Sequence, residues 1–115
     1  MSDIQKQLTQ IRNIIDTLEE ATEHFTTLVK NRELHPCTNM LSTIEEGFEA
    51  VIVSLNTSDG NLTELMQKLE EYILMIAQQL EQGRFIKIQE ILQFSFTPSL
   101  RTFKQAFVEV YGESL

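Results

Sequence analysis

The chain has little of what supports redox chemistry, sharp turns or a membrane anchor. Its 115 residues include one cysteine, two prolines, four glycines and no tryptophan. The lone Cys37 has no partner for an intramolecular disulfide, and this favours a cytoplasmic location. The longest apolar run, 72–77, is far shorter than the roughly 20 residues that span a bilayer, and the N-terminal residues lack the order of a signal peptide. We expect a single domain, residues 1–115, with no membrane partner.

Basic residues are also scarce. The chain has 9 Lys and Arg against 17 Asp and Glu, and its net charge is −8. The imbalance is strongest between Glu33 and Glu81, where Lys68 is the one base. Acidic surfaces repel the phosphates of nucleic acids and of anionic lipids. We therefore expect neither nucleic acid nor a membrane surface as a partner.

What the chain does have is a sustained apolar repeat. Near the N-terminus, residues spaced alternately by four and three positions form one stripe, in which a threonine is the only polar member: Ile4, Leu8, Ile11, Ile15, Leu18, Thr22, Phe25 and Val29. This spacing is typical of one face of a helix. Ser2 and Gln5 match a capping box, so we predict a first helix from Ser2 to about Asn31.

The same spacing continues in the next two segments. Pro36 places a connection at 32–36, because a helix interior does not tolerate proline, and the second helix is predicted from 37 or 38 to Asn56. Its apolar stripe is Leu41, Ile44, Phe48, Val51 and Leu55. Gly47 lies within the helix and indicates either the close approach of a neighbouring backbone or a tolerated surface position. The turn-forming residues 57–60 follow.

The third helix is predicted to begin at the cap Asn61 and to end at Gly83. The last segment contains Pro98, which either follows a cap at Thr97 or lies within one bent helix. The second alternative is favoured because the apolar stripe stays in register across the proline: Phe85, Ile88, Leu92, Phe96, Leu100, Phe103, Phe107 and Val110. Together the segments predict an all-α fold, an antiparallel up-down-up-down four-helix bundle with the last helix kinked near Pro98.

The last two helices carry more apolar side chains than one stripe needs. The additional residues are Leu74, Met75, Ile86, Ile91 and Phe94, with Phe96 beside them. They indicate either an exposed interaction site or deeper burial of the two helices. The first interpretation predicts a non-enzymatic interaction module, adaptor-like or chaperone-like, that binds a protein partner or forms a homodimer through these residues.

Catalytic motifs are absent from the sequence. The glycines are dispersed, so no phosphate-binding loop is formed, and no serine-centred or histidine-paired nucleophile is recognisable. His24, His35 and Cys37 do not complete a metal-binding pattern. We predict no catalytic residues and no cofactor, and whether the chain is an enzyme stays open.

One carboxylate pattern supports an alternative function. Glu19, Glu20 and Glu23, followed by Glu46 and Glu49, are similar to the acidic motifs of the MazG-type nucleotide pyrophosphohydrolases. That resemblance implies an all-α enzyme that binds Mg²⁺ between helices and cleaves nucleoside triphosphates. Clustered carboxylates are the ligands that such hard cations require.

A second resemblance covers roughly the last two thirds of the chain. Residues 46–50, 79–85 and 91–100 resemble a family of short, uncharacterised helical proteins from Gram-positive bacteria. In that family a helix ends at a glycine, the next begins at once, and an aromatic residue precedes a proline in the last helix. The resemblance implies a helical fold and no known activity.

Overall fold

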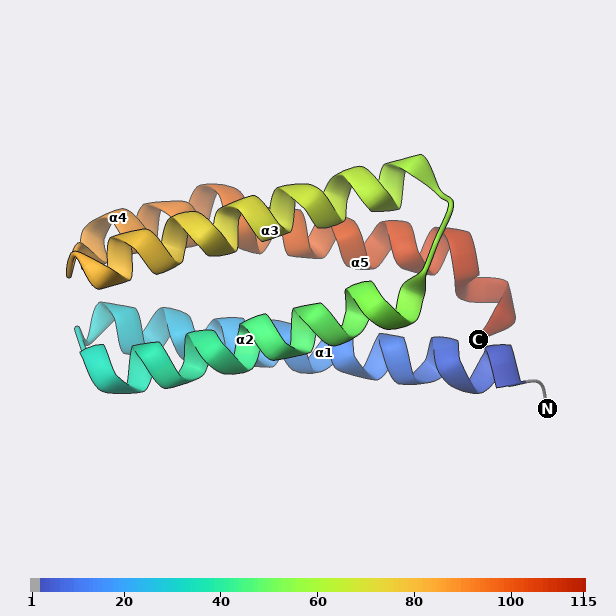
Figure 1. Ribbon diagram of the computed structural model, residues 1–115, viewed down its shortest axis with the longest axis horizontal. Coiled ribbons are helices and arrows are strands. Elements are labelled where there is room, and N and C mark those ends of the chain that lie inside the picture. The colour runs from blue at the N-terminus through green and yellow to red at the C-terminus, as the bar shows by residue number, and fades with distance from the viewer. Residues whose placement is uncertain (1–2) are drawn as a thin grey trace.

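The computed structural model describes residues 3–115, except for the side chain of Ser114, so the predicted cap Ser2 lies outside the described residues. These residues contain helices and no strand, which confirms the all-helical class. The helices form four long rods. Figure 1 shows them lying along the longest axis of a molecule that measures 46 × 23 × 18 Å. The first three rods are α1 (Asp3–Lys30), α2 (Leu34–Leu55) and α3 (Gly60–Glu81). The fourth consists of α4 (Phe85–Ile91), the π-helical turn η1 (Leu92–Phe96) and α5 (Thr97–Tyr111), followed by the 3-10 turn η2 (Gly112–Ser114).

The predicted apolar stripe of α1 faces the core. Its members from Leu8 to Val29 are all buried, whereas Ile4, in the first turn, is 68% exposed. Thr22 is buried too, and its hydroxyl donates a hydrogen bond of 2.7 Å to the carbonyl oxygen of Leu18. The one polar break in the stripe therefore enters the core with its donor satisfied, as buried polar groups require.

α2 begins earlier than the sequence predicts. It starts at Leu34, so that Pro36 lies in its first turn rather than before it. The prediction was wrong because the first N–H groups of a helix have no intrahelical partner, and a proline there costs little. Gly47 is a position of close approach, since a Cβ atom built on it would lie 2.9 Å from Cδ2 of Leu18 on α1.

The start of α3 also differs from the prediction. The N-cap is Asp59, whose side chain accepts a 2.9 Å hydrogen bond from the amide of Leu62, and Asn61 already lies within the helix. The other end agrees with the prediction. Gly83 follows α3 with a φ of +68°, a left-handed conformation that glycine adopts without strain.

The last rod stays helical from Phe85 to Tyr111 and contains one wide turn just before Pro98. In that turn the amide of Thr97 donates to the carbonyl of Leu92, five residues back. The sequence accounts for this turn in two ways. Successive core residues here are four apart, a longer step than the 3.6 residues of an α-helical turn. A proline ring also clashes with the carbonyl four residues before it in an α-helix.

The core lies between two pairs of helices. α1 packs most closely on α2, and α3 packs on the rod formed by α4, η1 and α5 (Figure 1). Near the chain termini, the Tyr111 hydroxyl contacts the Thr57 hydroxyl at 2.6 Å, and the Gln7 amide donates to the carbonyl of Ser54 at 2.7 Å. Among residues 3–115, none of the helices has the length and apolar character needed to cross a membrane.

Candidate binding surfaces

Four of the six residues predicted to bind a partner face solvent. Leu74 and Met75 project from α3, Ile86 from α4 and Phe94 from η1, and all four are exposed. Phe94 is the most exposed of the large apolar residues, with 72% of its surface accessible. A phenylalanine this exposed is unusual, because burying its ring releases a large apolar area from water.

The other two predicted residues belong to the interior. Phe96 is 3% exposed and lies in the core, so its assignment to an exposed partner-binding surface was wrong. The reason is its register. Phe96 continues the buried series of Leu92 and Leu100, whereas Phe94, two residues earlier, points to the opposite side of the helix. Ile91 is half-buried and packs against the core.

Exposed apolar residues are not confined to α3 and the last rod. Others lie on α1, α2 and α5: Ile4, Leu34, Val53, Val108 and Val110. Only part of the exposed apolar surface therefore lies where the sequence predicts it, on α3 and the last rod. Phe94 is set apart by being aromatic and by lying on the π-helical turn, a feature that often marks functional sites.

The first acidic motif lies on α1 and the second on α2. Glu19 faces α5, where its carboxylate lies 2.7 Å from Nζ of Lys104. Glu46 lines a shallow groove between α1 and α2 together with Thr17 and Ala21. Glu20, Glu23 and Glu49 are exposed. In the described part of the chain, no three His, Cys, Asp or Glu side chains come together as a metal site would require.

Lys104 joins α5 to α1 through two carboxylates. Its Nζ lies 2.8 Å from Asp16 and 2.7 Å from Glu19. The hydrogen bonds to Asp16 and then to Glu19 raise the pKa of the ammonium group above its usual value, because both favour the charged form. The Lys104 side chain is 35% exposed, so these bonds hold the two helices together without a deeply buried charge.

Cys37 lies in the core at the start of α2, and burial raises the pKa of its thiol, with a further contribution from the nearby charge of Glu33. A buried thiol that stays protonated is a poor nucleophile. The structure therefore offers no support for a reactive role of this cysteine.

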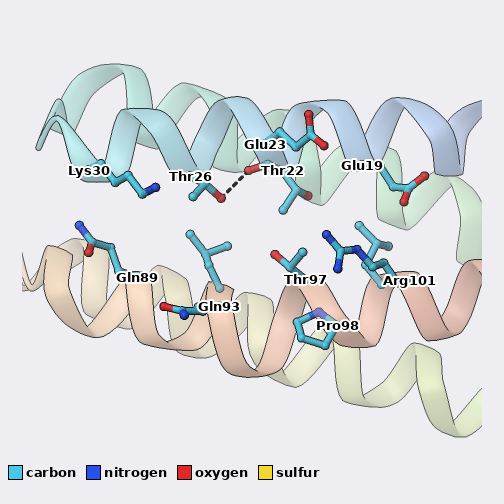
Figure 2. A pocket seen from close by; sticks show the side chains of 12 residues that line it. Glu19, Thr22, Glu23, Thr26, Lys30, Gln89, Gln93, Thr97, Pro98 and Arg101 are labelled. Atoms are coloured by element: carbon cyan, nitrogen blue, oxygen red, sulfur yellow. Dashed lines mark hydrogen bonds between the residues drawn. The ribbon is translucent and has the colours of Figure 1, made fainter.

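A cleft that the sequence did not predict lies between α1 and the last rod. Its volume is about 580 Å³, within the usual range of ligand-binding pockets. Figure 2 shows five residues of α1 facing seven residues of the last rod across it. Leu92 and Leu100 are buried at its base, and hydroxyl, amide and charged groups surround them. From sequence alone, only the polar Thr22 within the α1 stripe hinted at such a place.

Comparison with known proteins identifies a family but no activity. A family model described as "Domain of unknown function (DUF8042)" matches residues 7–106. No curated protein and no solved structure shows a significant match to the chain. The prediction that the chain belongs to an uncharacterised family is confirmed.

Proposed function

We propose that this chain, which belongs to the DUF8042 family, is a non-enzymatic protein-interaction module whose first partner is a second copy of itself. The observation that supports the proposal best is the exposure of Phe94 on the π-helical turn. Ile86 lies on α4 in the same rod as Phe94, and Leu74 lies on the neighbouring helix α3; both are exposed apolar side chains. A two-fold contact that covers Phe94 in both copies would use one surface twice.

The energy available from Phe94 is large. A phenylalanine side chain buries about 150–250 Å² in an interface, and 72% of this one is accessible in the isolated chain. At about 25 cal/mol per Å², covering it contributes roughly 3 kcal/mol per copy. Two copies of Phe94 thus favour association by about 6 kcal/mol before the entropy cost of binding.

The charge of the chain opposes this association. Each copy has a net charge of −8, so two copies repel each other over distances that salt shortens to about 8 Å at physiological ionic strength. We therefore expect the dimer to be stabilised by added salt. An interface formed by opposite charges would respond in the opposite way.

The experiment compares two variants by light scattering coupled to size exclusion. Phe94→Gln removes the exposed ring from η1. Val53→Gln is the matched control, since Val53 is 70% exposed but lies on α2. We expect the unmodified chain and Val53→Gln to be dimers and Phe94→Gln to be a monomer with unchanged helix content. If Phe94→Gln dimerises as well as the unmodified chain, the surface is not the one proposed.

The finer predictions belong to the same proposal. We propose that the helices form an antiparallel up-down-up-down bundle with a bend near Pro98, and that the protein is bacterial, from a Gram-positive organism, and cytoplasmic. An adaptor or chaperone role would add a protein partner to the surface around Phe94. The alternative of a Mg²⁺-dependent pyrophosphohydrolase is less well supported, because the described carboxylates of its two motifs do not gather into one group and Glu19 is bound to Lys104.

A further inference from the structure

The cleft between α1 and the last rod holds two cationic side chains that have no anionic partner. Lys30 extends its amine along the cleft toward Thr26, and Arg101 extends its guanidinium from the other end toward Thr97 (Figure 2). Within residues 3–115, neither side chain makes a hydrogen bond or an ion pair. The cleft therefore has an unpaired positive charge at each end, and either could pair with an anion that enters the cleft.

The missing partners are notable because carboxylates are abundant. The chain has 17 acidic residues for its 9 Lys and Arg, and Glu19 lies directly across from Arg101 (Figure 2). The carboxylate of Glu19 is already bound by Lys104 at 2.7 Å. Glu23 also borders the cleft, but its carboxylate points away from the opposite wall in Figure 2. The guanidinium of Arg101 is thus left free in a strongly acidic protein.

The remaining lining residues suit a ligand with an apolar body. Leu92, Leu100 and Pro98 provide a hydrophobic base on the last rod, and the hydroxyl of Thr97 and the amide of Gln93 lie beside it. The Thr97 and Gln93 side chains make no hydrogen bond with another described residue. Both can donate to an oxyanion, and the planar guanidinium of Arg101 matches a carboxylate or a phosphate with two parallel bonds.

From these observations we propose that the cleft binds a small organic oxyanion, a carboxylate or a phosphate monoester attached to an apolar group. Arg101 holds the charged group, Thr97 and Gln93 donate hydrogen bonds, and the apolar group lies against Leu92 and Leu100. Lys30, at the other end of the cleft, adds positive charge without contacting the bound group. Phe94 does not line the cleft. The proposed anion binding and the proposed dimer can therefore be tested separately, and one can fail without the other.

The test is an NMR titration of the full ¹⁵N-labelled chain with three probes of similar size. Phenyl phosphate and benzoate carry the two candidate anions on an apolar ring, and benzyl alcohol carries the ring without the charge. We expect saturable shifts of the amides around Thr97 and Thr26 with at least one anion, and at least tenfold weaker binding of benzyl alcohol. The anion that binds more tightly shows whether the cleft prefers a phosphate monoester or a carboxylate.

Variants separate this cleft from general anion binding. Arg101→Gln is expected to weaken binding of the preferred anion by about tenfold to a hundredfold, the usual effect of losing a charged hydrogen bond. Arg12→Gln is the matched control, because Arg12 is exposed on α1 outside the cleft, and it should bind as the unmodified chain does. The proposal is overturned if neither anion gives saturable shifts in the cleft, or if both variants weaken binding equally.

Discussion

Two phenylalanines separated by one residue should differ greatly in their contribution to stability. Phe96 is 3% exposed and Phe94 is 72% exposed, because residues two positions apart in a helix point to nearly opposite sides of it. Replacing a buried phenylalanine by alanine costs about 3–5 kcal/mol, since it removes apolar contacts and leaves a cavity. Replacing an exposed one changes stability by no more than about 0.5 kcal/mol.

The comparison is made by urea denaturation of Phe96→Ala and Phe94→Ala, followed by circular dichroism. Protein concentrations are kept low enough that self-association does not add to stability. With a slope of about 1–2 kcal/mol per molar urea for a domain of this size, Phe96→Ala should lower the midpoint by about 1.5–5 M. Phe94→Ala should leave it nearly unchanged. Equal losses, or a larger loss for Phe94→Ala, would refute the placement of Phe96 in the core and of Phe94 on the surface.

Three further predictions concern the helix contacts and ends. Gly47→Ala should leave the protein no more stable in thermal unfolding, because crowding of Leu18 offsets the roughly 1 kcal/mol gained in helix propensity; a full gain would show that the contact is loose. Asp59→Ala should cost about 1 kcal/mol in urea denaturation and Asn61→Ala much less, whereas the reverse order would restore Asn61 as the cap. Lys104→Gln should lower stability by no more than about 1 kcal/mol at pH 8, because the side chain is partly exposed. The pKa of Lys104 is higher in the folded chain than in the unfolded one, so its contribution is complete below the unfolded pKa and is lost as pH rises through the folded value. The difference between the two proteins should therefore shrink between pH 9 and pH 12, and a constant difference would contradict the role of the charge.

The buried stripes could be predicted from the sequence because burial follows helical periodicity. Leu8, Ile15, Phe25 and Val29 are in the core as their spacing indicates. The prediction fails at the end of the first stripe, where Ile4 lies in the first turn and is exposed. Periodicity indicates which face of a helix is apolar. It does not indicate over what length of the helix the neighbouring helices cover that face.

The helix starts were harder to predict because several residues compete for the same role. Asp59 and Asn61 are both good caps, and the structure selects the earlier one. Pro36 predicts a break before the second helix, but a proline is also tolerated in a first turn, and the structure places it there. The wide turn before Pro98 did leave a signal, since Ile88, Leu92 and Phe96 follow one another at intervals of four.

The sites depend on tertiary geometry and were only partly visible. Phe94 and Phe96 are equivalent in composition, and only their register separates an exposed ring from a buried one. The free cation in the cleft could be recognised only once the partner of Lys104 was known. Lys104 binds the carboxylate of Glu19, and this contact leaves Arg101 without a partner. Residue spacing alone places Phe96 on the buried stripe and Phe94 off it. It does not show which carboxylate pairs with Lys104 or that Arg101 has no partner.

Sedimentation equilibrium of the unmodified chain tests the proposed function most directly. The chain is measured from about 1 to 200 μM, in low salt and in high salt, a range that spans moderate dimer affinities. We expect the molar mass to rise with concentration from 13.3 kDa to twice that value, and to rise earlier in high salt, where the repulsion between acidic copies is screened. A molar mass of 13.3 kDa at every concentration and in both salts would contradict self-association through the Phe94 surface.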